Sequence, residues 1–114
     1  MSDCLFCGIV DGRVKADLVH QDDAVVAFND IGPKAPVHIL IIPRKHVASV
    51  SEITESDHAL IGAIFQVAAK LARERGIAES GYRVVVNSGA DAGQSVFHIH
   101  YHLLGGRQMG WPPG

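Results

Sequence analysis

The segment from His98 to His102 has a histidine at every second position, with Ile99 and Tyr101 between them. Side chains alternate between the two faces of a β-strand, so a strand here would place the three imidazoles on one face, about 6.6–6.8 Å apart. Ile99, Tyr101 and Leu103 would then point together into a core. Three histidines in a row weaken the packing of a strand face, so we predict that the row carries a function.

The rest of the sequence predicts an α+β domain with an antiparallel sheet and one long helix. The helix is expected over residues 55–75, because apolar side chains recur there at helical spacing and Gly76 follows as a stop signal. About five strands are expected, the first two as a hairpin, over residues 18–20, 24–28, 37–42, 82–87 and 96–104.

Composition narrows the class of protein. A chain of 114 residues with 47% hydrophobic and 19% charged residues predicts a single globular domain over residues 1–114. A net charge of −2 argues against a strongly basic nucleic-acid-binding surface. The sequence has no apolar run of about 18 residues, and its start lacks a basic segment followed by an apolar one. We therefore expect a cytoplasmic protein that binds neither nucleic acid nor membrane.

Two chemistries fit a row of imidazoles on one strand face. The three side chains could ligate a catalytic zinc ion, or one imidazole could act as a nucleophile while its neighbours position it and donate protons. The preceding segment, Asn87–Ser95, is rich in small, hydroxyl and amide residues and lacks the GxxxxGK[ST] pattern of a P-loop. Its backbone N–H groups could hold an anion over the histidine face, which favours phosphate chemistry with a histidine nucleophile.

Several sequence blocks resemble the histidine triad (HIT) superfamily, which implies a HIT-like fold with a short N-terminal helix. The resemblance covers almost the whole chain, and its blocks are DCLFCGI, FNDIGPKAPVHILIIPRKH and YRVVVNSGADAGQSVFHIHYHLLGGRQMGWPPG. The GRQM and WPPG endings resemble the nucleotide-binding (Hint) branch more than the diadenosine-polyphosphate hydrolase branch.

The resemblance implies a purine nucleoside phosphoramidase that needs no catalytic cofactor. His100 matches the residue that attacks the α-phosphate and forms a covalent nucleotidyl-imidazole, which water then cleaves. His102 matches a residue that contacts phosphate and supports proton transfer. His38 matches the residue that hydrogen-bonds the nucleophile and fixes its tautomer.

The resemblance also implies a set of substrate contacts and a dimer. AMP, GMP and their phosphoramidates are the expected ligands, and Asp30 matches the acid that binds the ribose hydroxyls. Trp111 matches a residue that reaches the site of a partner subunit, so a homodimer is expected. The purine pocket is expected to be walled by Phe6, Ile9, Phe28 and Ile31. The phosphate and the leaving group are expected to lie on Asn87, Gly93, Gln94 and the catalytic Ser95.

Cys4 and Cys7 form a C-x-x-C motif near the start of the chain. The thioredoxin-like βαβ context of a redox motif is missing, and a structural zinc site would need two further nitrogen or sulfur ligands. Similar prokaryotic members of the family bind zinc through such a motif and two histidines, which implies a structural zinc site on Cys4, Cys7, His46 and His98. The alternative is two unligated thiols. His20 and His58 match no motif and are expected to face solvent.

Two other functions remain open at the level of sequence. The protein could be a zinc-stabilised nucleotide-binding or interaction module whose turnover is incidental. It could also be a zinc-dependent hydrolase in which His98, His100 and His102 hold the catalytic metal.

Overall fold

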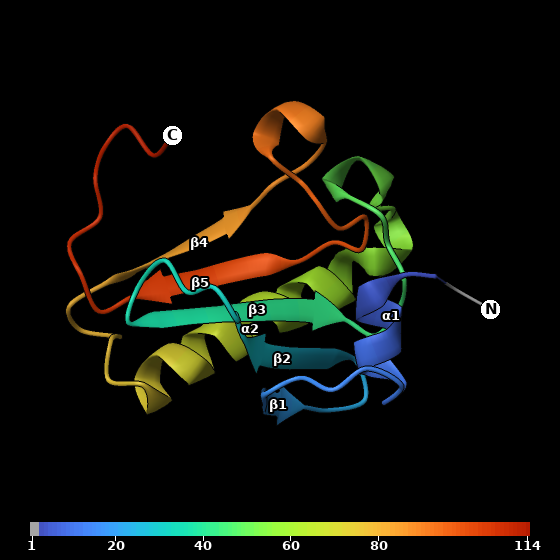
Figure 1. Cartoon of the computed structure of the whole chain (residues 1–114), viewed down its shortest axis with the longest axis horizontal. Helices are drawn as coiled ribbons and strands as arrows, with labels where there is room; N and C mark the ends of the chain where they lie inside the picture. Colours follow the sequence, from blue (N-terminus) through green and yellow to red (C-terminus); the bar gives the residue numbers. More distant parts are fainter. Residues whose placement is uncertain (1–2) are drawn as a thin grey trace.

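A five-stranded antiparallel sheet in the order β1-β2-β3-β5-β4 forms the centre of the computed structural model, which describes residues 3–114 (Figure 1). This confirms the predicted α+β fold with one long helix and a short N-terminal helix. In the described part of the chain, no helix is both long enough and apolar enough to cross a membrane. The helices and strands are α1 (Leu5–Val10), β1 (Leu18–Gln21), β2 (Val25–Asn29), β3 (Val37–Pro43), α2 (His58–Glu74), β4 (Tyr82–Val86) and β5 (Tyr101–Gly105).

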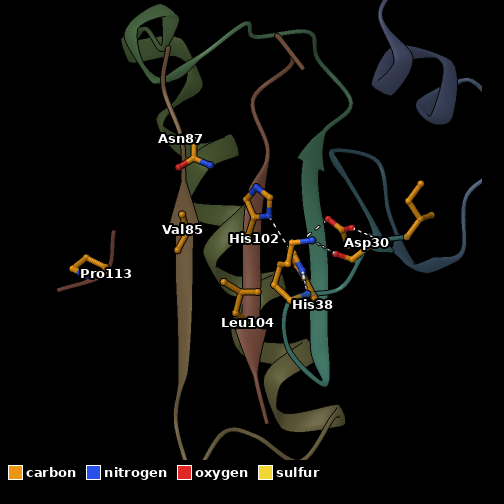
Figure 2. Close-up of a pocket in the computed structure, with 10 residues that line it drawn as sticks. Asp30, His38, Val85, Asn87, His102, Leu104 and Pro113 are labelled. Carbon is orange, nitrogen blue, oxygen red and sulfur yellow. Dashed lines mark hydrogen bonds and ion pairs between the residues drawn. The ribbon is translucent and has the colours of Figure 1, made fainter. Parts of the chain in front are cut away.

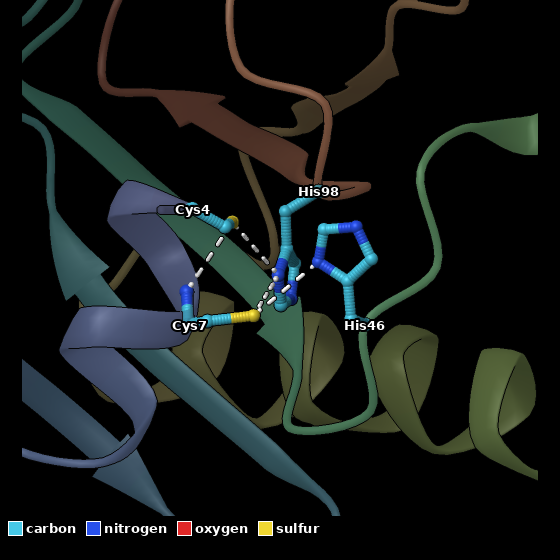
Figure 3. A group of neighbouring side chains, drawn as sticks. All are labelled: Cys4, Cys7, His46 and His98. Carbon is cyan, nitrogen blue, oxygen red and sulfur yellow. Dashed lines mark hydrogen bonds between the residues drawn. The ribbon is translucent and has the colours of Figure 1, made fainter. Parts of the chain in front are cut away.

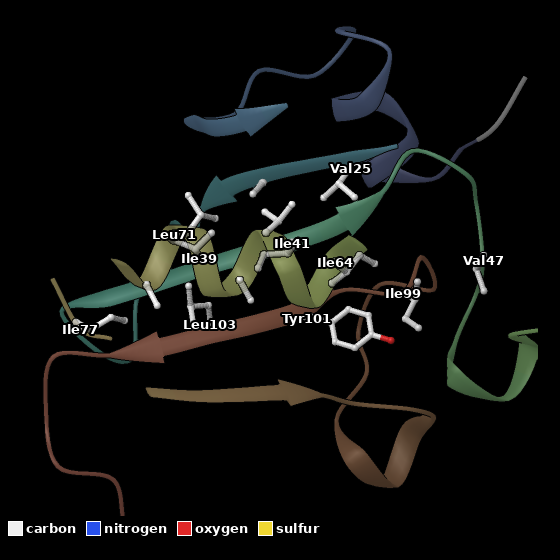
Figure 4. Close-up of a cluster of buried hydrophobic side chains, with 14 residues drawn as sticks. Val25, Ile39, Ile41, Val47, Ile64, Leu71, Ile77, Ile99, Tyr101 and Leu103 are labelled. Carbon is white, nitrogen blue, oxygen red and sulfur yellow. The ribbon is translucent and has the colours of Figure 1, made fainter. Parts of the chain in front are cut away.

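β2 and β3 are buried on both faces, because α2 covers one face of the sheet and α1 covers part of the other. α2 lies along one face of the sheet, where its apolar side contacts alternate residues of β2, β3 and β5 (Figure 4). α1 covers part of the opposite face, where Phe6 and Ile9 pack on Val26, Phe28 and Leu40. Every residue of β3 after Val37 is buried, as expected for a strand between two apolar layers.

The long helix begins three residues later than predicted. A 3₁₀ turn, Glu55–Asp57, precedes α2, and a capping box between Thr54 and Asp57 satisfies its backbone. The Asp57 carboxylate is only 2% exposed. It accepts a hydrogen bond from Lys45 Nζ at 2.6 Å, which lowers the pKa of Asp57. This contact ties the start of α2 to the segment that carries His46.

The last strand is shorter than predicted, because β5 begins at Tyr101 and not at residue 96. Tyr101 pairs with Ile41 of β3 and Val86 of β4, which are the last residues of those strands to pair with β5. Before Tyr101 the chain therefore has no ladder partner, and the N–H of Ile99 donates to the carbonyl of Val47 at 2.7 Å. The predicted alternation still holds, since Ile99, Tyr101 and Leu103 all belong to the core under α2.

His20 differs from its predicted position on the surface. Its side chain is 11% exposed and lies between Asp22 and α2. Nε2 is 2.7 Å from Asp22 Oδ2, and Nδ1 is 3.2 Å from Lys70 Nζ. The hairpin packs against the side of α2, which the local sequence does not reveal. His58 is exposed, as predicted.

Candidate functional site

Two cavities meet on the face of the sheet that α2 does not cover. The first, of about 530 Å³, is lined by His38, His102 and Asn87 among others (Figure 2). The second, of about 420 Å³, is lined mainly by apolar side chains around α1. Asp30 and Ile31 border both cavities. The sheet therefore presents two cavities side by side, joined at the loop that follows β2. We call the one that contains His38 and His102 the polar cavity, and the one around α1 the apolar cavity.

Two hydrogen bonds join Lys34, His38 and His102 in the polar cavity, and their donors and acceptors can be assigned in only one way. The backbone N–H of Lys34 donates to Nδ1 of His38 at 3.0 Å, so the proton of a neutral His38 must lie on Nε2. This Nε2–H donates to Nδ1 of His102 at 2.9 Å (Figure 2). The proton of a neutral His102 therefore lies on its Nε2. Asp30 Oδ2 is 3.5 Å from His38 Nε2 and supports the same tautomer.

Burial keeps both imidazoles in the neutral form that this chain requires. It lowers the pKa of His38, against the attraction of the nearby Asp30 carboxylate. It lowers the pKa of His102 further, to about 4, with a smaller contribution from the neighbouring His100. A neutral His102 with its proton on Nε2 can donate a hydrogen bond through that N–H to a substrate at neutral pH.

We expect the low pKa of His102 to make the protein less stable in mild acid. The unfolded chain takes up a proton on this residue near pH 6.5, whereas the folded chain does so only near pH 4. Stability from this residue is therefore complete above pH 6.5 and decreases as the pH falls toward 4. Because the imidazole retains some contact with solvent, we expect a loss of about 1–3 kcal/mol.

Urea unfolding of the wild type and of His102→Asn at pH 7 and pH 5 measures this effect. The asparagine can still accept the hydrogen bond from His38 and does not titrate. The wild type should lose more stability between the two pH values than the variant does. Equal losses would show that His102 has an ordinary pKa in the folded protein.

His100 lies beside this chain of hydrogen bonds but is oriented by its own backbone. Its ring is 7% exposed, and its Nδ1 lies 2.9 Å from the carbonyl oxygen of His98. Since a carbonyl only accepts, Nδ1–H is the donor and Nε2 keeps an available lone pair. The ring centroids of His100 and His102 lie 5.1 Å apart. His38 was predicted to hydrogen-bond His100, but it hydrogen-bonds His102 instead. The tautomer of His100 is fixed by the carbonyl of His98.

The apolar cavity contains the residues predicted for a purine pocket. Phe6, Ile9 and Phe28 line it, and the two phenylalanine rings meet edge to face with centroids 5.5 Å apart. Ile31 is fully exposed at the rim, and Ser95 lies on the side toward the loop. A cavity with aromatic and aliphatic walls suits a flat heteroaromatic ring.

Three polar residues of this cavity were not predicted. Lys15, Asp17 and Asn29 also line it, and Asn29 Nδ2 donates to Asp17 Oδ2 at 2.8 Å. Asn29 precedes Asp30 and could have been included for that reason. Lys15 and Asp17 belong to no motif, and they reach the cavity because the backbone N–H of Asn29 hydrogen-bonds the carbonyl of Asp17.

The loop between β4 and the histidine row is held together by a glutamine. The side chain of Gln94 is buried, and its predicted contact with substrate stays a prediction. Its Oε1 accepts from the N–H of Gly89, and its Nε2 donates to the carbonyls of Ala48 and Val96. Gln94 therefore holds the loop in shape. Gly93 ends a short 3₁₀ turn with a φ of 90°, a conformation that favours glycine.

The C-terminal tail runs along the open side of the polar cavity. Pro113 borders that cavity, whereas the side chain of Trp111 is 83% exposed. The guanidinium of Arg83 lies 5.9 Å from the centre of the Trp111 ring. The predicted role of Trp111 at a partner subunit remains a prediction, since the structure contains one chain.

Cys4, Cys7, His46 and His98 come together at the N-terminal helix (Figure 3), with their four donor atoms within 4.8 Å of one another. His98 Nδ1 is 3.5 Å from each sulfur, and His46 Nδ1 is 3.3 Å from Cys7 Sγ. Ligand atoms of a tetrahedral zinc ion lie about 3.3–3.8 Å apart. His98 Nε2 donates to the carbonyl of Pro43 at 2.8 Å, which leaves Nδ1 available as a ligand. These residues fit a structural zinc ion.

The histidine row itself does not form a metal site. His98 Nδ1 points to the cysteines, His100 Nδ1 to its own backbone and His102 Nδ1 to His38. Among the residues described, the only other close group of potential ligands is Asp30, His38 and His102, which the chain of hydrogen bonds already joins. The arrangement therefore favours a histidine nucleophile over a catalytic metal held by the row.

Comparisons with known proteins identify the family. Residues 11–109 match the model of the HIT domain. An uncharacterized HIT-like protein of Synechocystis sp. is 45% identical over 112 residues, which cover 98% of this chain and 97% of that protein. The crystal structure of a HIT family hydrolase from Legionella pneumophila has a TM-score of 0.97 and 50% identity, covering 98% of this chain and all of that one. A histidine triad nucleotide-binding protein from Candida albicans has a TM-score of 0.83 and 32% identity, covering 96% of this chain and 83% of that one.

Proposed function

The chain belongs to the HIT domain family, and on that premise we propose that it is a nucleotide-binding hydrolase of the Hint branch. Its proposed substrates are 5′-phosphoramidates of adenosine and other purine nucleosides, and the bond cleaved is P–N. Support for hydrolysis and for nucleotide binding comes from similar structures named as a HIT family hydrolase and as a nucleotide-binding protein. The whole chain, residues 1–114, is taken as one HIT domain.

The two joined cavities suggest how such a nucleotide would bind. The purine would occupy the apolar cavity between Phe6 and Phe28, where its ring faces meet apolar walls. Asp30 borders both cavities and would accept hydrogen bonds from the ribose hydroxyls. The α-phosphate would then lie over His100 and His102, with backbone N–H groups of residues 87–95 and the Ser95 hydroxyl as donors.

The directed chain of hydrogen bonds is the single observation that carries the mechanism. Nε2 of His100 attacks phosphorus, a P–Nε2 bond forms and the P–N bond of the substrate breaks. The leaving nitrogen, which takes a proton from solvent before the attack, departs as a neutral amine, while the Nε2–H of His102 donates a hydrogen bond to a phosphate oxygen. The Nδ1–H of the phosphorylated His100 is held by the carbonyl of His98, which stabilises its positive charge.

Hydrolysis of the intermediate uses the same contacts, and the Nε2–H of His102 again donates to a phosphate oxygen. The water oxygen attacks phosphorus and the P–Nε2 bond breaks, which releases AMP and restores the lone pair of His100. The proton that the water loses passes to solvent, which balances the one taken up by the leaving nitrogen and leaves the site in its starting state. No metal is required for either step.

Trapping the intermediate tests this proposal. Wild-type protein is mixed with adenosine 5′-phosphoramidate, quenched in alkali within the first turnover and analysed by peptide mass spectrometry. We expect an AMP adduct on the peptide that contains His100, and continued release of the amine at later times. Binding of AMP without release of amine from any phosphoramidate would instead support the binding-module alternative. Loss of turnover on chelation, with the fold intact, would support a zinc-dependent hydrolase.

We further propose that the protein is a cytoplasmic homodimer with a structural zinc ion in each chain. The edge strand β4 and the exposed Trp111 are available for contact with a second copy. Two cysteines placed with two histidines in a metal-ligand arrangement suit a reducing compartment.

A further inference from the structure

The N-terminal helix connects the cysteine–histidine cluster to the proposed nucleotide site. Phe6 lies in α1 between Cys4 and Cys7, and its side chain lines the apolar cavity. Its ring centroid is 5.1 Å from that of His100 at an interplanar angle of 90°. It is 5.5 Å from Phe28 and 6.1 Å from His98. A shift of α1 would therefore move a wall of the cavity and a neighbour of the nucleophile together.

A second connection passes through His98. Its Nδ1 faces the two sulfurs, while its backbone carbonyl accepts the hydrogen bond that orients His100. The ring is fully buried and is fixed from the other side by the carbonyl of Pro43. One residue thus takes part in both the cluster and the orientation of the nucleophile.

The position of α1 depends on these contacts. A helix of six residues is too short to be stable alone, so its place on the sheet is set by the apolar packing of Phe6 and Ile9 and by the cluster. The N–H of Cys7 donates to Cys4 Sγ at 3.4 Å, so the first turn of the helix and the cluster form one unit. A metal held by the cluster would hold this unit against the sheet.

We infer that Phe6 is a positioning residue through which the Cys4–Cys7–His46–His98 cluster and the purine pocket are coupled. A metal on the cluster orders α1 and with it the Phe6 wall, so a nucleotide binds more tightly. By thermodynamic linkage, a nucleotide in the pocket must raise the affinity of the cluster for metal by the same factor. This inference rests on the proposed nucleotide site but not on its catalytic activity.

The coupling is measured on the zinc-loaded protein with zinc affinity as the readout. Competition with a chromogenic chelator gives the dissociation constant for zinc, with and without saturating AMP. We expect AMP to tighten zinc binding by about 5-fold or more in the wild type. In Phe6→Leu the factor should fall below about twofold, even at AMP concentrations that saturate the variant. Phe65→Leu, the same change at a half-exposed position of α2, should retain the wild-type factor.

The same coupling can be measured from the nucleotide side. The affinity for AMP, measured by calorimetry on loaded and zinc-free wild type, should change by the same factor. If the zinc-free protein unfolds, the comparison of Phe6→Leu with Phe65→Leu in the loaded state still decides the question. A zinc affinity that AMP does not change in the wild type, or a Phe6→Leu variant with full coupling, overturns the inference. If only the proposed hydrolysis is wrong, AMP would still change the affinity for zinc, but no phosphoramidate would be turned over. A protein that does not bind AMP overturns both.

Discussion

Replacing His100 with alanine should reduce kcat for adenosine 5′-phosphoramidate by about 10³-fold or more. In the proposed mechanism the substitution removes the atom that accepts the nucleotide, Nε2 of His100, and no neighbouring imidazole is placed to replace it. Nδ1 of His102 already accepts a hydrogen bond from His38, and His98 points toward the cysteines. The AMP adduct should disappear together with the activity. Steady-state release of the amine measures the first effect, and peptide mass spectrometry measures the second.

Two further variants separate loss of chemistry from loss of structure. His100→Asn keeps a side-chain N–H that can donate to the carbonyl of His98, so it should fold well and remain inactive. His58→Ala changes an exposed histidine at the start of α2 and should be fully active. A residual activity above about a tenth of wild type in both His100 variants would exclude His100 as the nucleophile.

The effect of His102 should be smaller than that of His100. Loss of one hydrogen-bond donor to the charge that develops in the transition state costs about 10²–10³-fold in kcat. Release of the amine by His102→Ala should therefore remain measurable where that of His100→Ala does not.

Much of the fold and of the site could be predicted from sequence because the signals are local. Alternation in HIHYHLL placed Ile99, Tyr101 and Leu103 in the core, and helical spacing placed α2. The start of β5 was wrong by several residues, because a strand needs partners and those partners end at Ile41 and Val86. Ile99 still points into the core, although the chain before Tyr101 pairs with neither neighbouring strand.

The partners of polar groups could not be predicted in the same way. Gln94 looked like a substrate contact, yet it satisfies backbone groups at Gly89, Ala48 and Val96. His38 was assigned to His100, whereas register pairs it with Leu104 and so places it diagonally to His102, which it hydrogen-bonds. Both outcomes depend on which strands and loops become neighbours, information that a single sequence does not contain.

Removing the metal from the cysteine–histidine cluster should cost a large part of the stability. A ligand at 1,000 times its dissociation constant stabilises the folded state by about 4 kcal/mol. For a domain of this size that corresponds to a decrease in Tm of about 15 °C when a chelator removes the metal. We expect about one zinc per chain in the wild type and none in Cys4→Ser. Metal analysis of purified protein and thermal unfolding with and without chelator measure the two effects.

A matched pair of histidine variants assigns the effect to the metal. His46 and His58 are both exposed, so neither contributes much packing to the fold. Nδ1 of His46 faces Cys7 Sγ at 3.3 Å, whereas His58 lies at the start of α2, away from the cluster. His46→Asn should therefore lose zinc and lower the Tm nearly as much as Cys4→Ser does, while His58→Asn should change neither. If wild-type protein contains no zinc, or if the chelator leaves its Tm unchanged, the cluster is a pair of thiols beside two histidines and not a metal site.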